Sequence, residues 1–146
     1  MKISLASDHA GFEYKELIKQ YLLDLGYEIS DFGTDSKESA DYPDFAYQAA
    51  KAVSDGICER GIIICGTGIG VTITANKVSG IRAANCYTVE MAILSRQHNN
   101  ANILNFGSRL IPIETAKQIT QAFLTTEFEG GRHQSRIDKI HSLTGR

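Results

Sequence analysis

Short apolar segments alternate with helical patterns along the chain, and this alternation restricts the possible folds more than any other feature. Five segments have the length and apolarity of β-strands, at residues 3–7, 27–32, 61–65, 81–86 and 102–106. The connections between them have the length of helical crossovers, which join parallel strands. The sequence therefore predicts a parallel sheet with helices on both of its faces.

Glycine and proline residues mark several ends of the predicted helices. Gly26 stops a first helix, and Pro43 suits the first turn of the next. The first helix carries one apolar stripe, formed by Tyr14, Leu17, Ile18, Tyr21, Leu22 and Leu25. The other helices are predicted at residues 43–55, 69–78, 89–96, 112–123 and 132–143. We expect one domain, residues 1–146, with a doubly wound, Rossmann-like α/β fold: a three-layer αβα sandwich with a five-stranded parallel sheet and an extra C-terminal helix.

The composition excludes several classes of protein. A net charge of −2 over 146 residues argues against a general nucleic-acid or membrane-surface binder. No apolar run approaches the roughly 20 residues of a membrane span, and the N-terminus lacks the pattern of a signal peptide. Cys58, Cys65 and Cys86 form no CxxC pair, so neither a disulfide framework nor a structural zinc site is indicated. We expect a cytoplasmic protein without nucleic-acid or membrane partners.

The segment 61–71 is the most distinctive motif of the chain. Its apolar strand ends at Cys65, and glycines then alternate with larger residues in Gly66-Thr67-Gly68-Ile69-Gly70. Glycines let backbone N–H groups surround a ligand, and the N-terminus of a following helix attracts anions. The motif lacks the last glycine of a dinucleotide fingerprint, where Val71 stands, and it lacks the Gly-Lys-Ser/Thr of a P-loop. We interpret it as a cradle for another anion, with a plain strand-to-helix turn as the structural alternative.

Polar side chains follow three of the predicted strands. Asp8 and His9 follow the first strand, Cys65 ends the third, and Arg109 follows the fifth. Ligands of doubly wound sheets bind at the carboxyl ends of the strands, where these residues would meet. A thiol beside a helix N-terminus is favoured as the thiolate and can act as a base or a nucleophile. A nucleophile elbow needs a glycine where Ile63 stands, so we favour a base.

These residues also have structural interpretations. A free cysteine is often only a small buried hydrophobe, and Asp8 could cap the first helix. His98 stands in a polar segment where a histidine can simply be solvated. Arg132 and Arg136 share one helix face, which suits a phosphate or a solvated basic helix. A metal site is disfavoured because no compact ligand motif joins the candidates Asp8, His9, Cys65 and His98.

Together, a base, an anion cradle, a histidine and a pair of arginines fit proton abstraction beside a carbonyl in a phosphorylated small molecule. At this point the chain resembles the type B ribose-5-phosphate isomerase family, which also includes the two-subunit galactose-6-phosphate isomerases. The resemblance covers essentially the whole chain. Its matching segments are Ser7-Asp8-His9-Ala10-Gly11, Asp41-Tyr42-Pro43, Cys65-Gly66-Thr67-Gly68-Ile69-Gly70, Ala75-Asn76-Lys77, Gly80-Ile81-Arg82-Ala83, Ser95-Arg96-Gln97-His98-Asn99, Phe106-Gly107-Ser108-Arg109 and Glu129-Gly130-Gly131-Arg132-His133.

The resemblance implies an aldose–ketose isomerase of the non-oxidative pentose phosphate pathway that needs neither a metal nor an organic cofactor. Cys65 would take the proton beside the carbonyl to give a cis-enediolate, which backbone N–H groups from Gly66 to Gly70 would hold. Thr67 would assist proton movement, and His98 would open the furanose ring, with Asp8 near the ring oxygen. The phosphate would bind to His9, Arg132 and Arg136 with Arg109 nearby, and the sugar would also contact Tyr42, Ile69 and Asn99.

The resemblance also implies a homodimer with shared active sites, possibly a dimer of dimers. Some family members replace the cysteine base with a glutamate, where this chain has Val71, so Cys65 assigns the chain to the cysteine branch. All implied site residues stand on one chain, which favours ribose 5-phosphate as the substrate. The alternatives are an isomerase of allose 6-phosphate or galactose 6-phosphate, a non-catalytic sugar-phosphate-binding protein, and a cysteine hydrolase, which the missing glycine at Ile63 disfavours.

Overall fold

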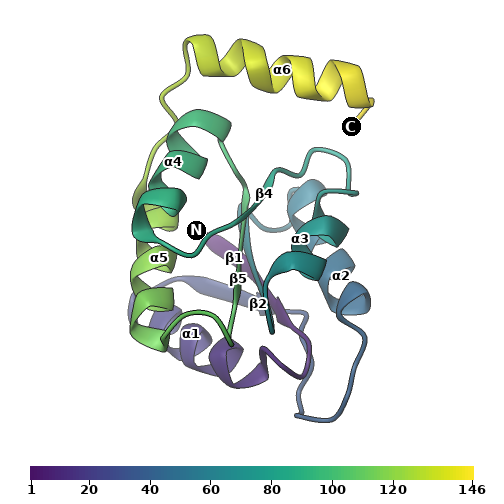
Figure 1. Cartoon of the computed structure of the whole chain (residues 1–146), viewed down its shortest axis with the longest axis vertical. Coiled ribbons are helices and arrows are strands. Elements are labelled where there is room, and N and C mark those ends of the chain that lie inside the picture. The colour runs from purple at the N-terminus through teal and green to yellow at the C-terminus, as the bar shows by residue number, and fades with distance from the viewer.

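The computed structural model describes all 146 residues, in which strands and helices alternate as predicted (Figure 1). The strands are β1 (Lys2–Ser7), β2 (Glu28–Asp31), β3 (Arg60–Cys65), β4 (Ala83–Asn85) and β5 (Ile103–Gly107). The helices are α1 (Phe12–Asp24), α2 (Tyr42–Ser54), α3 (Ile69–Ala75), α4 (Val89–Asn99), α5 (Ile113–Thr125) and α6 (Arg132–Thr144). The predicted three-layer α/β fold with an extra C-terminal helix is confirmed.

All neighbouring strands are parallel, in the order β2-β1-β3-β5-β4. From β1 the chain crosses to β2 on one side, and from β3 it crosses to β4 on the other side. The sheet therefore has its topological switch point between β1 and β3, where doubly wound folds bind their ligands. Cys65 ends β3 beside Gly107 of β5, so the thiol reaches this edge.

Helices α1, α4 and α5 cover one face of the sheet, and α2 and α3 cover the other (Figure 1). Each face has its own apolar core. The first contains Ile18 of α1 and Phe123 of α5, packed against Leu5 and Phe106 of the sheet. The second is made mostly of alanines and small aliphatic residues of α2 and α3, which allows these helices to approach the strands closely.

The predicted stripe of α1 is partly wrong. Ile18 and Leu22 are buried, but Leu17 and Leu25 are exposed, and Lys15 is buried instead. The Lys15 ammonium lies 2.6 Å from a carboxylate oxygen of Asp31 at the end of β2, and an equal distance from Glu16. A paired ammonium on a long apolar stem can be buried where an unpaired one cannot.

Several element boundaries differ from the prediction, among them those of β4, α3 and α4. The strand predicted at 81–86 covers only Ala83–Asn85, because the N–H of Arg82 donates to the Asn102 side chain at 2.8 Å. The helix predicted at 69–78 ends at Ala75. The helix predicted at 89–96 continues to Asn99 and ends where Asn100 adopts a left-handed conformation with φ of 45°.

Helix α6 lies apart from the two helical layers, above the end of α4 (Figure 1). Only His133 and Ile137 of this helix are buried. None of the helices has the length and apolarity that crossing a membrane requires. One flank of α6 therefore anchors it to the body of the protein, and the rest of its surface is open.

Candidate active site

A cavity of about 210 Å³ lies at the switch point of the sheet. It is lined by the ends of β1 and β3, the glycine loop, the start of α2 and the turn after β5, through Asp8, His9, Ala10, Tyr42, Cys65, Gly66, Thr67, Gly70 and Arg109. The predicted convergence of polar residues from three strand ends is confirmed. The cavity is smaller than the ~300–1,000 Å³ of typical small-molecule sites.

Cys65 differs from the other two cysteines in its surroundings. Its sulfur accepts a hydrogen bond from the N–H of Gly68 at 3.0 Å and faces the cavity. Cys58 and Cys86 are buried in the two cores, and burial raises the pKa of both thiols, that of Cys86 to about 11. Cys65 is thus the cysteine whose sulfur accepts a backbone hydrogen bond at the wall of a cavity.

The glycines of the loop allow close contacts that a Cβ would prevent. A Cβ on Gly66 would lie 3.0 Å from the Arg109 guanidinium, and one on Gly70 would lie 2.6 Å from the Tyr42 ring. Gly68 has a φ of 78°, which other residues rarely adopt. The glycines are therefore needed at these positions, because the Arg109 and Tyr42 side chains pack directly against the backbone of the loop.

Asp8 and His9 are held on the opposite wall of the cavity. One carboxylate oxygen of Asp8 accepts the N–H of Gly11 at 3.1 Å. Gly11 is itself the N-cap of α1 and no side chain caps this helix, so the helix-capping interpretation of Asp8 is wrong. The Nδ1 atom of His9 lies 3.1 Å from the N–H of Ala40 in the loop before α2. Both side chains are fixed without a ligand, and one oxygen of Asp8 has no partner within the turn.

The remaining predicted residues lie at the other end of the molecule. Helix α4 follows the carboxyl end of β4 and returns to the amino end of β5, so His98 and Asn99 in its last turn lie at the amino edge of the sheet. Arg132 and Arg136 project from the exposed start of α6, which packs above this end of α4 (Figure 1). Asn99 lines a different cavity of about 380 Å³, between α6 and β4. Within one chain, the structure does not bring His98 to Cys65.

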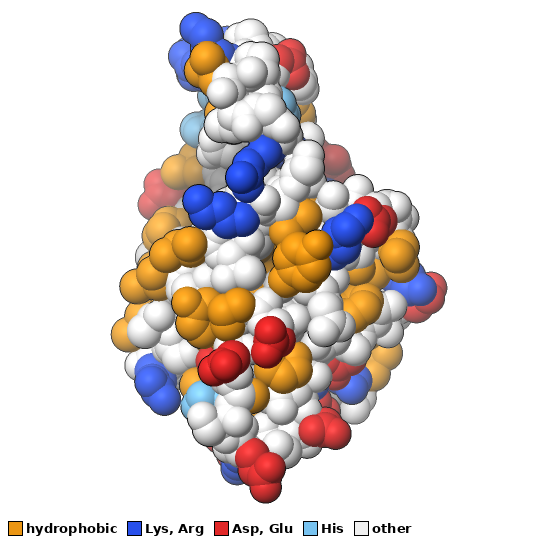
Figure 2. Space-filling view, turned by 90° about the vertical axis from the view of Figure 1, so that its right-hand side faces the viewer, with side chains coloured by type: hydrophobic (Ala, Val, Ile, Leu, Met, Phe, Trp, Pro, Cys, Tyr) orange, Lys and Arg blue, Asp and Glu red, His pale blue; other side chains and the backbone are white.

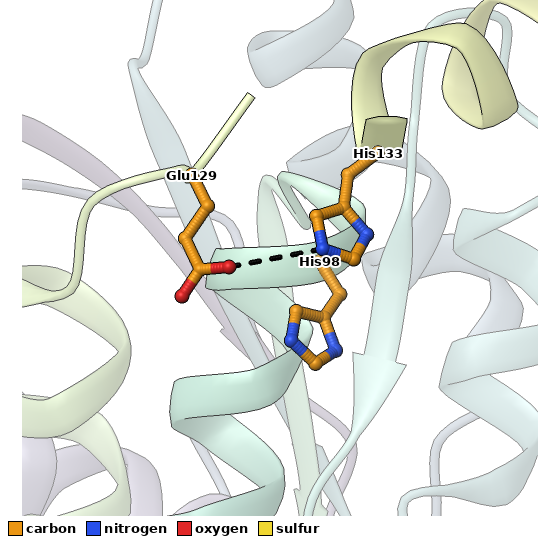
Figure 3. Close-up of side chains that lie close together, drawn as sticks. All are labelled: His98, Glu129 and His133. Atoms are coloured by element: carbon orange, nitrogen blue, oxygen red, sulfur yellow. Dashed lines mark ion pairs between the residues drawn. The ribbon is translucent and has the colours of Figure 1, made fainter. Parts of the chain in front are cut away.

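Three side chains meet at this second end: His98, Glu129 and His133 (Figure 3). The two imidazole rings are stacked with centroids 4.4 Å apart and planes 11° apart. A Glu129 oxygen lies 3.7 Å from Nε2 of His133. An imidazole binds a metal in its own ring plane, and an ion in the plane of one stacked ring would lie outside the plane of the other. The arrangement is therefore that of an aromatic stack with a carboxylate neighbour.

The stack affects the protonation of His133. Burial lowers the pKa of His133, and the positive charges of His98, Arg132 and Arg136 lower it further, while Glu129 opposes this change. Two imidazolium rings in face-to-face contact would repel each other. The stack therefore favours a neutral His133.

Exposed hydrophobic side chains lie on the face that α2 and α3 form, and one of them, Tyr42, also lines the cavity. Figure 2 shows hydrophobic groups in the middle of the face that α2 and α3 form, with Lys and Arg side chains above them. Four of the exposed residues of α2 and α3, with 39% to 58% of their surface exposed, are Tyr42, Tyr47, Ile69 and Ile73. Apolar patches of this kind mark surfaces that bind another molecule.

The fold and the cavity define a class: a doubly wound α/β protein with a thiol and a glycine-rich loop at the switch point of its sheet. The family model of the ribose/galactose isomerases matches residues 3–140. The chain belongs to the ribose/galactose isomerase family.

Individual relatives agree with this assignment. The chain is 48% identical over 145 residues to ribose-5-phosphate isomerase B of Escherichia coli, covering 99% of this chain and 97% of that protein. It is 43% identical to the D-erythrulose-4-phosphate isomerase of Pectobacterium atrosepticum, covering 96% and 93% of the two chains.

Solved structures give the same result. Ribose-5-phosphate isomerase B of Clostridium thermocellum superposes with a TM-score of 0.98 at 50% identity, covering 99% of this chain and 98% of that one. The enzyme of Mycoplasma genitalium with bound ribulose 5-phosphate superposes with a TM-score of 0.95 at 41% identity, covering 99% and 97%.

Four residues without a predicted role lie close to the predicted site residues. His133 and Glu129 belong to a quoted motif, but only the folded chain brings His133 onto His98. Asn85 and Tyr87 contact the glycine loop from β4 and the segment after it. No sequence signal identifies Asn85 and Tyr87, because their contacts with the loop depend on the direction in which the Thr67 carbonyl points in the folded chain.

Proposed function

We propose that the chain is a ribose-5-phosphate isomerase of type B, which interconverts ribose 5-phosphate and ribulose 5-phosphate without a metal or organic cofactor. The observation that carries the proposal is the Cys65 thiol, which lies 3.0 Å from a backbone donor in a cavity that also contains Asp8, His9 and Arg109. A base, an anion-binding loop and a positive charge at one strand edge suit proton transfer beside a carbonyl.

In this mechanism the open-chain aldose binds with its carbonyl end against the glycine loop. The Cys65 thiolate takes the proton from C2, and the electron pair of the broken C–H bond forms the double bond of a cis-enediolate. Backbone N–H groups between Gly66 and Gly70 stabilise the negative oxygen. Thr67 assists proton transfer between the two oxygens. Return of the proton from Cys65 to C1 gives the ketose, so no oxidant or reductant is required.

The second half of the machinery comes from another copy of the chain. His98 would open the furanose ring beside Asp8, and Arg132 and Arg136 would bind the phosphate together with His9. These three donors lie at the far end of their own chain, so we propose a homodimer in which each site combines the strand-end cavity of one copy with α4 and α6 of the other. Dimers could pair further into tetramers.

Three features support a shared site. The cavity, of about 210 Å³, is smaller than typical small-molecule sites, and neither Arg132 nor Arg136 of the same chain lines it. The face that α2 and α3 form carries exposed apolar residues such as Tyr42 and Ile69, which a partner would cover. Helix α6 has a largely open surface that carries the exposed arginines. In a twofold dimer, symmetry repeats each contact between the two copies, so the dimer contains two complete sites.

The proposed compartment is the cytoplasm. All three cysteines are free, and Cys65 must remain reduced to act as a base.

A comparison of phosphosugars tests the proposed substrate. The kcat/KM for ribose 5-phosphate should exceed the values for allose 6-phosphate, galactose 6-phosphate and D-erythrulose 4-phosphate, the last included because a 43% identical relative is named for it. Cys65→Ala should lower turnover by about 10²–10⁴-fold, the range for loss of a general base. Cys58→Ala is the matched control, because Cys58 is buried in the core and should leave turnover unchanged.

Two outcomes would contradict the proposal. Near-normal turnover by a folded Cys65→Ala variant would exclude this thiol as the base. Thermal stabilisation by phosphosugars with no turnover of any of them would favour the non-catalytic binding protein.

A further inference from the structure

A tyrosine outside the predicted site is hydrogen-bonded to the glycine loop. Tyr87 follows the edge strand β4, and its hydroxyl lies 2.7 Å from the carbonyl oxygen of Thr67. The hydroxyl also lies 2.7 Å from the side-chain nitrogen of Asn85. A carbonyl oxygen can only accept, so the hydroxyl donates to Thr67 and the Asn85 amide donates to the hydroxyl. Two short hydrogen bonds in series thus connect Asn85 to the loop, and the Asn85 amide also donates directly to the Thr67 carbonyl over a longer 3.5 Å.

These hydrogen bonds fix the direction of one peptide group. The carbonyl of Thr67 and the N–H of Gly68 belong to the same planar trans peptide, so they point in opposite directions. With the carbonyl held by Tyr87, the N–H points to the other side of the loop. There it donates to the sulfur of Cys65 at 3.0 Å.

The packing around Gly68 restricts the peptide further. A Cβ at this position would lie 2.2 Å from the side-chain oxygen of Asn85, so only glycine allows the contact. That oxygen is buried and has no hydrogen-bond partner. Asn85 therefore contacts the loop in three ways: by packing against Gly68, through the Tyr87 hydroxyl, and by a longer direct hydrogen bond of 3.5 Å to the Thr67 carbonyl.

We propose that Tyr87, supported by Asn85, is a positioning residue that aims the Gly68 N–H at the Cys65 sulfur and thereby favours the thiolate. A hydrogen bond donated to sulfur stabilises the charged form more than the neutral thiol. Tyr87 acts only through the peptide and does not line the cavity. The inference deepens the proposed function, in which Cys65 is the base, but it concerns the state of the thiol and can be tested without substrate.

The test is the pH dependence of Cys65 alkylation by iodoacetamide, followed by mass spectrometry of the peptide that contains Cys65. Tyr87→Phe removes the hydroxyl and keeps the ring. We expect the midpoint to move by about 0.5–1 pH unit toward higher pH, and the rate at neutral pH to fall about 3–10-fold, as for the loss of one hydrogen bond. Asn85→Leu keeps the short hydrogen bond from the Tyr87 hydroxyl, but removes the donor to that hydroxyl and the longer direct bond to Thr67, so it should change the profile in the same direction and less.

Tyr14→Phe is the matched control. Its hydroxyl donates to the carbonyl of Ile111 at 2.7 Å, away from the glycine loop, so it removes the same kind of hydrogen bond without touching Cys65. Thermal unfolding checks that each variant is folded, and Asn85→Leu gives an independent test of the network. Alkylation profiles of both network variants that match the Tyr14→Phe profile would overturn the proposal.

Isomerase assays on the same samples separate this inference from the proposed function. A changed alkylation profile in Tyr87→Phe, with no isomerase activity in the unmodified protein, would support the positioning role and contradict the proposed function. Lost isomerase activity with an unchanged alkylation profile would contradict the positioning role, because Tyr87 would then act on the reaction by another route.

Discussion

Two regions of the molecule are built in different ways. One is the strand-end cavity, which contains Cys65, and the other is the opposite end of the chain, the α4–α6 end, where α4 carries His98 and α6 carries Arg132 and Arg136. The cavity is formed by tight turns that the sheet itself places together, and its residues are fixed by backbone contacts such as the hydrogen bond from Gly68 to Cys65. The α4–α6 end depends on a helix with only two buried residues, and its arginines are exposed. The difference fits the proposed dimer, in which the prearranged cavity of one copy meets the α4–α6 end of the other.

The largest effect at the α4–α6 end is expected from His98→Ala. Loss of the group that opens the ring should lower kcat/KM for ribose 5-phosphate by about 10²-fold, at the lower end of the range for general acid–base catalysis. His141→Ala is the control, because this histidine of α6 contacts Arg82 and lies outside the stack. Equal kcat/KM values for the two variants would remove His98 from the mechanism.

The arginines should change binding more than turnover. Arg132→Gln and Arg136→Gln should each raise KM by roughly 10–100-fold, as for loss of a charge-assisted hydrogen bond to phosphate, with a smaller change in kcat. Lys139→Gln removes an exposed positive charge from the same helix and should leave KM within about twofold if specific contacts matter more than net charge. If all three variants raise KM equally, α6 supplies only a general positive field.

The smallest effect concerns pH and stability. Because the pKa of His133 is lowered in the folded protein, the unfolded chain takes up a proton more readily, and stability should fall as the pH decreases below about 6.5. The loss is complete below the folded pKa. His133→Gln should reduce the difference in unfolding temperature between pH 7.5 and 5.5, measured by calorimetry. An unchanged difference would show that the stack does not govern this pH dependence.

The sequence predicted the elements well where local chemistry defines them. Gly26 and Pro43 mark real helix boundaries, and the strand ending at Cys65 lies where its apolar run predicts. Features set by distant partners could not be predicted. The buried Lys15 depends on Asp31 of β2, and the predicted strand around Arg82 is shortened by a side chain of Asn102.

The same distinction holds for the site. The carboxyl ends of parallel strands meet in any doubly wound sheet, so the meeting of Asp8, Cys65 and Arg109 followed from element order alone. The position of His98 follows from the return direction of α4, and its ring contact with His133 required the placement of α6. The link from Tyr87 to Cys65 required the orientation of one peptide.

The central claim is that each site combines Cys65 of one copy with His98 of another, and hybrid dimers test it directly. Cys65→Ala and His98→Ala chains are co-expressed with different affinity tags, and the hybrid is purified over both. In the hybrid, one site contains both substitutions and the other contains neither, so a shared site predicts about half of the unmodified dimer's activity from two nearly inactive parents. If Cys65 and His98 acted within one chain, every site would carry one substitution. A hybrid as inactive as its parents would contradict the account.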